Sequence, residues 1–374
     1  MNERATPRLS DRQRLCWLRL IRTQNVGPAS FRDLINRFGS AETALEMLPE
    51  LMVSGGFSRP LRIPAVAEAE AELETARKAG ARFVGIGEPG YPPLLATMDH
   101  PPPLLAIKGQ PLVFDLPAVA IVGARNASLA GIKMARTLAA ELGREGYAVI
   151  SGLARGIDTA AHQGSLATGT VGVLAGGLDM PYPPENAGLI DDICAHGGAV
   201  VSEMPFGWQP RAQDFPRRNR LVAGAAFGLV VVEAAKRSGS LISARLAAEM
   251  GRLVFAVPGS PLDPRAGGTN ALLKDGAILV TETADIAQAV APLAGAAVSV
   301  AASLDEPPDF SATPPPGDED RARVIEALGP VPVSTDEIIQ HTRLHAAQVF
   351  MVLLELDLAG RLERHAGGNV SLIF

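Results

Sequence analysis

A short basic segment is the part of this chain whose residue types most clearly indicate chemistry. In Phe215-Pro216-Arg217-Arg218-Asn219-Arg220, three arginines fall within four positions. Guanidinium groups donate charge-assisted hydrogen bonds to anionic oxygens. Ser238-Gly239-Ser240 follows soon after and opens a predicted helix, where free backbone N–H groups attract anions. Together the two segments predict a phosphate-binding site.

The charge distribution of the chain concentrates this signal. The 374 residues carry a formal net charge of −6, whereas residues 211–252 contain eight Lys or Arg and only three Asp or Glu. A basic region within an acidic chain indicates one face that meets an anion, not a generally basic surface. The alternative at this stage is that these cations are solvated on helix surfaces.

The elements that must position these residues lie between residues 80 and 292. Apolar, β-branched segments alternate there with helical segments, which is typical of a parallel sheet covered on both faces. We therefore expect an α/β domain with a Rossmann-like, doubly wound, mostly parallel sheet. The predicted strands are residues 119–122, 148–150, 170–174, 199–202, 229–232 and 253–257.

Ligands of such sheets bind at the carboxyl ends of the strands, so the candidate residues are mainly those that follow each strand. Glycine permits close approach of the backbone, and hydroxyl and N–H groups satisfy phosphate oxygens. The candidate binding residues are Gly123, Arg125, Ser151, Gly152, Gly177, Asn186, Phe215, Arg217, Arg218, Asn219, Arg220, Ser238, Gly239 and Ser240. Four further residues are expected to support the site structurally: Asp158, His162, Glu203 and Glu233. Glu203 or Glu233 is the acid that could form an ion pair with one of the arginines.

Several classes of cofactor site and catalytic site are excluded. The first strand leads into Gly123-Ala124-Arg125 without a GxGxxG motif, which argues against NAD or FAD, and no P-loop is present. His162 has no second His at metal-ligand spacing, and the two cysteines form no CxxC, so we expect no metal and no cofactor. Ser151, Asp158 and His162 lack a nucleophile elbow, and His162 is expected to order the adjacent turn. No catalytic residue is predicted.

The flanking regions predict smaller domains. Residues 8–65 read as short helices broken at Asn25-Val26-Gly27-Pro28, which resembles a SAM-like or helix-hairpin-helix domain. Some such hairpins present backbone N–H groups to DNA phosphates. The alternative to this DNA-binding role is a small helical docking domain. Residues 293–318 are rich in proline and are predicted to be an extended linker.

Residues 319–374 predict three helices and a β-hairpin, an arrangement that resembles a winged helix. Ser334 and Glu337 have the spacing of a capping box at the start of the second helix. From residue 318 onward there are five arginines and nine acidic residues. Phosphate repulsion disfavours duplex binding by such a domain, so a protein-contact role is the preferred interpretation.

The motifs of the central region, in their order and spacing, resemble the bacterial DNA-processing protein A (DprA/Smf) family. The resemblance covers residues 80–290 strongly and extends to both flanking domains. It rests on Val122-Gly123-Ala124-Arg125, Ser151 to Asp158, Tyr182-Pro183 with Asn186, Ser202-Glu203 with Pro205, Phe215 to Arg220, and Ser238 to Ile242. One departure is Ala124, where the family usually carries Ser, which leaves the backbone N–H and Arg125 to bind.

The resemblance implies a single-stranded-DNA-binding recombination mediator of natural transformation. Such a protein protects incoming strands and helps to load the RecA recombinase. It is not an enzyme, and it forms a homodimer through the Rossmann-like domain. We expect a base to stack on Phe215, Trp208 or Tyr182, and the alternative for Phe215 is that it is a core residue. Binding is expected to be sequence-tolerant, salt-sensitive and weaker for duplex DNA.

The competing hypothesis is enzymatic. The same sheet resembles lysine-decarboxylase-like phosphoribohydrolases, in which a Glu near a Gly-Gly-x-Gly-Thr loop acts on a nucleoside monophosphate. Here Ser-Gly-Ser follows Glu233 instead, and a monophosphate does not require the arginine-rich segment. The N-terminal residues lack an apolar signal segment, and the longest apolar run, 221–232, is too short to span a bilayer. We therefore expect a cytoplasmic protein without a membrane partner.

Overall fold

The computed structural model describes residues 8–54, 61–295 and 315–373. The chain divides into two compact units. The first, here called the sheet unit, is formed mainly by Ala71–Val300, and the second, the helical unit, by Leu9–Glu70 together with Ala301–Phe374. Most of the predicted linker at 293–318 lies outside the described residues.

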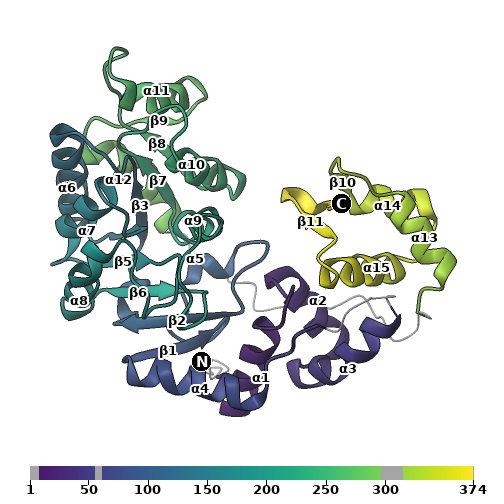
Figure 1. Ribbon diagram of the computed structural model, residues 1–374. Coiled ribbons are helices and arrows are strands. Elements are labelled where there is room, and N and C mark those ends of the chain that lie inside the picture. The colour runs from purple at the N-terminus through teal and green to yellow at the C-terminus, as the bar shows by residue number, and fades with distance from the viewer. Residues whose placement is uncertain (1–7, 55–60, 296–314, 374) are drawn as a thin grey trace. The chain divides into compact units, whose positions relative to one another are not determined.

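The sheet unit is built on a nine-stranded sheet in the order β1-β2-β6-β5-β4-β3-β7-β8-β9 (Figure 1). All neighbours from β6 to β9 pair in parallel, while β1 and β2 are antiparallel at one edge. The strands are β1 Ala81–Gly85, β2 Leu104–Gly109, β3 Ala118–Val122, β4 Ala148–Ser151, β5 Thr170–Val173, β6 Ala199–Ser202, β7 Gly228–Val231, β8 Leu253–Ala256 and β9 Ile278–Leu279. The predicted doubly wound, mostly parallel sheet is confirmed. The structure also contains three edge strands that were not predicted, β1, β2 and β9.

Helices cover both faces of this sheet, because alternate residues of each strand point to opposite sides. Ala120 and Val122 join the core under one set of helices, and Val119 and Ile121 join the core under the other. The first set is α5 Pro93–Ala96, α9 Asp214–Gly224 and α10 Ser240–Glu249, and the second is α6 Leu129–Arg144, α7 Ile157–Ser165 and α12 Thr283–Ala294. The unit also contains α4 Val66–Lys78 at its boundary, α8 Ala187–Ala195 and α11 Gly267–Lys274.

The direction of winding reverses between β3 and β7. After β3 the chain passes through α6 to β4 on one side, and after β7 it passes through α10 to β8 on the other. The two strands are hydrogen-bonded neighbours whose last residues, Val122 and Val231, are in register. Because α6 and α10 lie on opposite faces, the loops that follow β3 and β7 diverge and leave a crevice at the switch point.

The helical unit combines the N-terminal helices with the C-terminal domain. Its helices are α1 Asp11–Ile21, α2 Pro28–Phe38, α3 Ala41–Ser54, α13 Asp318–Glu326, α14 Thr335–Thr342 and α15 Ala346–Leu358. The strands β10 Val333–Ser334, β11 Leu362–Arg364 and β12 Asn369–Leu372 form a small sheet. The predicted capping box at α14 is present: Asp336 N–H donates to Ser334 Oγ at 3.2 Å, and Ser334 N–H donates to Glu337 Oε2 at 3.2 Å. Within the described residues, no helix has the length and apolar character needed to cross a membrane.

Candidate nucleic-acid interface

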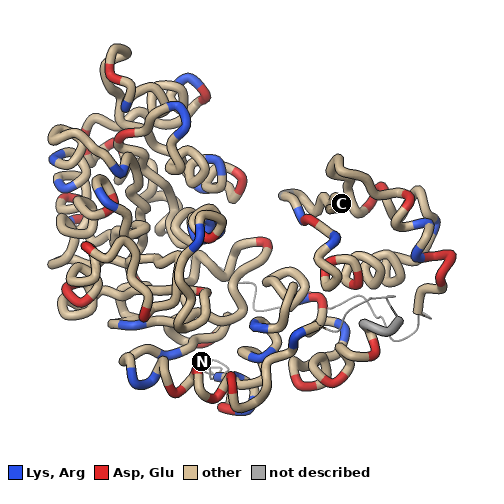
Figure 2. The backbone as a smooth tube through the Cα atoms, viewed as in Figure 1, with Lys and Arg blue, Asp and Glu red and all other residues tan. Residues whose placement is uncertain are grey.

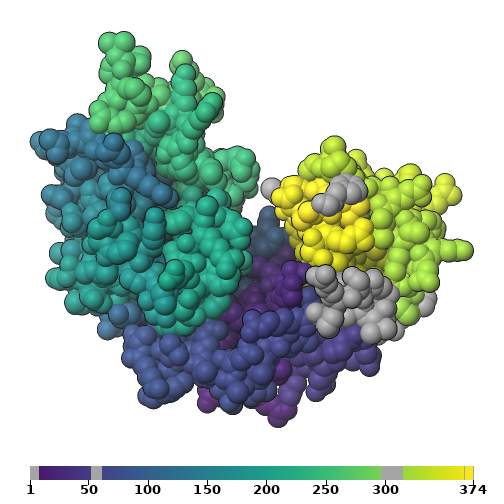
Figure 3. All heavy atoms as spheres, in the orientation of Figure 1, coloured from purple at the N-terminus to yellow at the C-terminus, as the bar shows by residue number. Residues whose placement is uncertain are grey.

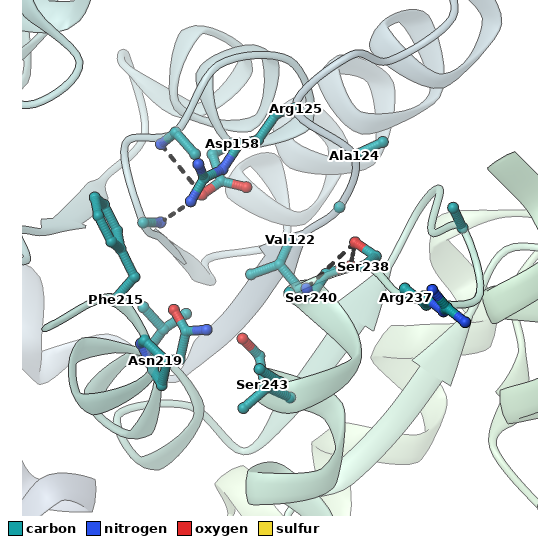
Figure 4. Close-up of a pocket in the computed structure, with 18 of the residues that line it drawn as sticks. Val122, Ala124, Arg125, Asp158, Phe215, Asn219, Arg237, Ser238, Ser240 and Ser243 are labelled. Atoms are coloured by element: carbon teal, nitrogen blue, oxygen red, sulfur yellow. Dashed lines mark hydrogen bonds between the residues drawn. The ribbon is translucent and has the colours of Figure 1, made fainter. Parts of the chain in front are cut away.

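A pocket of about 540 Å³ lies at the switch point of the sheet. Residues 122–126 after β3 and part of 152–158 after β4 line it on one side. The first turns of α9 and residues 235–243, which lead into α10, line the other (Figure 4). The predicted site residues that line the pocket are Gly123, Arg125, Gly152, Phe215, Arg218, Asn219, Ser238, Gly239 and Ser240. Those that do not are Ser151, Gly177, Asn186, Arg217 and Arg220.

The pocket contains an aromatic side chain beneath an exposed cation. The guanidinium carbon of Arg125 lies 5.1 Å from the centroid of the Phe215 ring, a cation–π distance. Phe215 also meets Tyr182 edge to face, with ring centroids 5.4 Å apart, and Tyr182 is 49% exposed. Trp208, the third predicted stacking residue, instead donates from Nε1 to Asp214 at 2.9 Å and does not line the pocket.

The N-terminus of α10 supplies donors on the opposite side of the pocket. The hydroxyls of Ser238 and Ser240 lie 2.7 Å apart, and both residues line the pocket. The N–H of Gly239 has no acceptor among the described residues, and the residue is exposed. Free N–H groups and the helix dipole favour an anion at this position.

Arg217 and Arg220 lie outside the pocket and share one acid. Arg217 Nε donates to Glu203 Oε1 at 3.0 Å, and Arg220 pairs with the other oxygen of Glu203. The Glu203 side chain is only 7% exposed, and Arg220 also donates to the carbonyl of His100 at 3.1 Å. These two arginines therefore hold the end of β6 against α9, whereas the sequence placed both among the phosphate ligands.

Arg218 is buried behind the pocket, with 6% exposure. Its Nη1 donates to the carbonyls of Gly152 and Val173, at the ends of β4 and β5. Burial lowers the pKa of Arg218 to about 10, and the Asp158 carboxylate opposes that shift. A Cβ at residue 152 would lie 2.6 Å from Nη1, so this contact requires glycine there. Arg218 thus positions the 152 loop and places a positive charge behind it, instead of projecting freely toward a ligand.

Three predicted site residues support the same loop: Ser151 and Asn186 from outside the pocket, and Asp158 from its lining. Ser151 Oγ donates to Ile121 O at 2.6 Å, and Asn186 Nδ2 donates to Leu153 O at 2.7 Å. Asp158, predicted as structural, accepts from the N–H groups of Gly152 at 3.1 Å and Ala154 at 3.3 Å. Burial raises the pKa of Asp158, and Arg218 and the two N–H groups oppose the rise. Neither Ser151 nor Asn186 lines the pocket, and their hydrogen bonds to backbone carbonyls order the loop.

Two further predicted residues also have structural partners. Gly177 N–H donates to Trp208 O at 3.0 Å, and a Cβ there would lie 2.4 Å from Pro205 O. Glu233 accepts from Ser128 N–H at 2.9 Å and from the Ser128 hydroxyl, and it does not line the pocket. Its carboxylate therefore anchors the start of α6, and this geometry gives no support to a catalytic Glu in a hydrolase.

Comparison with known proteins places this architecture in a family. The family described as DNA recombination-mediator protein A matches residues 82–291, more than half of the chain. The DprA-like N-terminal HHH domain matches residues 11–75, and the DprA winged helix domain matches residues 306–368. Protein Smf of Escherichia coli is 38% identical over 285 residues, which is 75% of each chain.

The chain belongs to the DNA recombination-mediator protein A (DprA/Smf) family. That family is described as one of recombination mediators and not of enzymes, as the resemblance implied. The structure of DprA from Streptococcus pneumoniae matches with a TM-score of 0.57 and 34% identity, over 70% of this chain and 86% of that one. DprA from Helicobacter pylori, solved for its single-stranded DNA binding mode, matches with a TM-score of 0.51 and 29% identity, over 56% and 96% of the two chains.

The sequence analysis missed two cations of this DprA-family pocket. Arg237 is exposed beside the start of α10 and has no ion-pair partner among the described residues. Arg265 lines the pocket from the segment before α11 and pairs with Asp263 at 2.9 Å. Arg237 belongs to the basic region described above. Its position directly before Ser238, at the start of a predicted helix, is the sequence feature that could have identified it as a site residue.

His162, in α7, is fully buried and contacts Thr170 at the start of β5. Thr170 Oγ1 donates to Val149 O at 2.8 Å, so it must accept from His162 Nδ1, which lies 2.8 Å away. Nδ1 therefore carries a proton, and the buried Nε2 has no hydrogen-bond partner among the described residues, which disfavours a second proton there. Burial lowers the pKa of His162 to about 3, and the charge of Arg218 adds to the shift.

This buried imidazole predicts a loss of stability in mild acid. Below about pH 6.5 the unfolded state binds a proton at residue 162 that the folded state does not bind. The free energy of unfolding therefore decreases as the pH is lowered, by up to about 1.4 kcal/mol per pH unit. Urea unfolding at pH 7 and pH 5 measures the fall. His162→Asn retains a donor to Thr170 and should reduce the fall by about 2 kcal/mol, whereas His196→Asn, at an exposed position, should leave it unchanged. Equal falls in the two variants contradict the prediction.

Proposed function

We propose that this chain binds single-stranded DNA in the switch-point pocket and acts as a recombination mediator that loads a RecA-type recombinase. The observation that supports this most strongly is the set of groups that meet there. Arg125 and Arg237 have no carboxylate partner among the described residues, and they converge with the N-terminus of α10. An aromatic pair, half-buried Phe215 and exposed Tyr182, lies beside them. This combination suits a phosphate and an unstacked base.

In the proposed complex each group has one task. Arg125 and Arg237 neutralise phosphates, and the Gly239 N–H with the Ser240 hydroxyl bonds their oxygens. A base stacks on the ring of Phe215, worth about 1–3 kcal/mol. Only unpaired strands expose base faces, so duplex DNA gains the phosphate contacts without the stacking. The single-stranded DNA binding of the Helicobacter pylori relative supports this assignment.

In this proposal the chain forms a homodimer through the sheet unit. It acts in natural transformation, in the cytoplasm. Two pockets in one homodimer bind one strand with higher avidity than a single pocket. Light scattering of the purified chain tests the homodimer, with twice the chain mass as the expected result.

Recombinase loading is tested by the RecA-dependent hydrolysis of ATP on single strands coated with single-strand-binding protein. We expect the chain to shorten the lag before hydrolysis severalfold, because a bound mediator holds strand open to the recombinase. An unchanged lag, with the chain shown to be bound to the strand, contradicts the loading role.

A further inference from the structure

Helix α15 is buried on two sides within the helical unit. One face packs into the core of the winged-helix domain, and the other packs against α1 to α3. The residues of the first face include Val349, Val352, Leu353 and Leu356. Leu354 and Leu358 form the second face and share a cluster with Leu20, Phe31, Leu34 and Leu48 of the N-terminal helices. In Figure 3 the C-terminal residues, in yellow, lie against these purple helices.

Polar contacts fix the same interface. Asn25, in the hairpin between α1 and α2, donates from Nδ2 to the carbonyl of Leu358 at 2.8 Å. Asn25 has a φ of 61°, a left-handed conformation that asparagine tolerates better than most residues. Arg364 of β11 pairs with Asp33 of α2 at 2.7 Å and with Asp357 of its own domain at 2.9 Å. The hairpin and the last turn of α15 therefore cover each other.

The charges across this interface are complementary. Asp33 and Arg37 lie one turn apart on α2, and the winged-helix domain offers Arg364 to the first and Glu355 to the second. Burial lowers the pKa of Arg37, and the Glu355 carboxylate opposes that shift. Glu355 is itself buried and held by Arg321 at 2.8 Å. The Arg364–Asp33 ion pair joins the two domains on this face of α2, and such a charge pair favours one docked arrangement.

These surfaces are the ones that nucleic-acid-binding domains of the same kinds use. The third helix of a helix-turn-helix variant enters the major groove, but α15 has no Lys or Arg and carries Glu355 and Asp357. Helix-hairpin-helix turns offer N–H groups to phosphates. Here Val26 N–H donates to Thr23 O at 3.1 Å and Gly27 N–H to Ser30 Oγ at 2.9 Å. Figure 2 shows acidic positions along α13 and α14 as well.

We propose that α15 is a protein-docking helix whose partner is the N-terminal helical domain of the same chain, and that the docked pair does not bind duplex DNA. Each domain covers the element with which the other would approach nucleic acid. All DNA affinity of the chain then resides in the sheet unit. The docking rests on contacts within the helical unit alone, whereas the placement of all DNA affinity in the sheet unit rests on the proposed function.

Hydrogen exchange of the full chain, read by mass spectrometry, tests the docking. Leu358→Asp removes an apolar contact to the N-terminal helices, and we expect deuterium uptake in residues 25–38 to rise about tenfold. Phe350→Asp is the control, because Phe350 is 38% exposed on the same helix and belongs to neither cluster. Peptides from β11 and β12 report whether the winged-helix domain stays folded. Unchanged uptake in residues 25–38, with that domain folded, overturns the docking.

Two further measurements keep the proposal falsifiable if Leu358→Asp unfolds its own domain. Asp33→Asn removes the ion pair between the domains but leaves Arg364 paired with Asp357, and it should raise the same uptake about two- to fivefold. An unchanged uptake in Asp33→Asn overturns the docking too. Arg125→Ala/Arg237→Ala should leave no measurable affinity for a 20-base-pair duplex. A salt-dependent duplex affinity in that variant, with α15 still protected, overturns the second part of the proposal.

Discussion

The double variant Arg125→Ala/Arg237→Ala lowers the affinity for a labelled oligo-dT strand by at least about 100-fold. Both side chains line the pocket, and neither has a carboxylate partner among the described residues, so each is available for a phosphate. A hydrogen bond to a charged group contributes about 1.5–3 kcal/mol, and two such losses exceed a 100-fold change. The slope of log affinity against log salt also falls by about 1.4, since a phosphate contact on a single strand contributes about 0.7. Fluorescence anisotropy over a salt series measures both quantities.

A matched control removes two cations elsewhere in the sheet unit. Arg136 and Arg245 are exposed and lie outside the pocket, with Arg136 bonded to Gln163 at 2.7 Å and Arg245 paired with Glu249 at 3.5 Å. Their double alanine variant has the same net charge and should lose less than threefold in affinity. If the two double variants lose affinity equally, the binding is a general charge effect and the pocket is not its site.

The second large effect is expected in stability. Arg218→Met lowers the free energy of unfolding by about 3–5 kcal/mol, the usual cost of breaking a buried charge pair. The carbonyls of Gly152 and Val173 lose their donor, and Asp158 remains buried without its nearby cation. Urea unfolding at pH 7 measures the change. Oligo-dT affinity should fall as well, at temperatures where the variant is folded, because the 152 loop loses its support.

Arg217→Met is the control for this prediction. Its side chain is 48% exposed, and Arg220 remains paired with Glu203 when it is removed. We expect a change of less than about 1 kcal/mol, as for other exposed ion pairs. Equal destabilisation by the two substitutions would show that Arg218 has no special structural role.

The sheet was largely predictable from sequence because its central strands are buried on both faces. Continuous apolar runs such as Val119–Val122 and Leu229–Val232 have few other interpretations. The edge strands were harder to find. In β1 Arg82 is exposed within an otherwise buried strand, and β2 follows three prolines and pairs antiparallel to β6. The described part of β9 has two residues, too few to produce a pattern.

The site was predictable in location but not in the division of roles. The rule that ligands bind at strand ends identified Gly123, Gly152 and the turn before α10. Sequence reasoning could not separate the role of Arg218 from that of Arg125, since both are arginines in segments predicted to meet an anion. That difference depends on where the carbonyls of residues 152 and 173 fall in the tertiary structure.

Docking within the helical unit could not be predicted from sequence either. Asn25 and Leu358 are 333 positions apart, and their contact is a side chain meeting a backbone carbonyl. The acidic charge of the C-terminal domain predicted a protein contact, but no local pattern indicates which protein. Leu354 and Leu358 belong to a helix in which most residues are apolar. Its sequence therefore does not show that these two leucines form a second buried face.

The most direct test of the proposed function is the affinity of the full chain for a labelled oligo-dT strand and for a duplex of equal length, by fluorescence anisotropy over a salt series. The pocket predicts single-strand binding whose logarithm falls linearly with log salt and which exceeds duplex binding by at least about fivefold, since one stacked base contributes about 1–3 kcal/mol. Folded protein that does not bind the strand at low salt, or that binds the strand and the duplex equally, would contradict it.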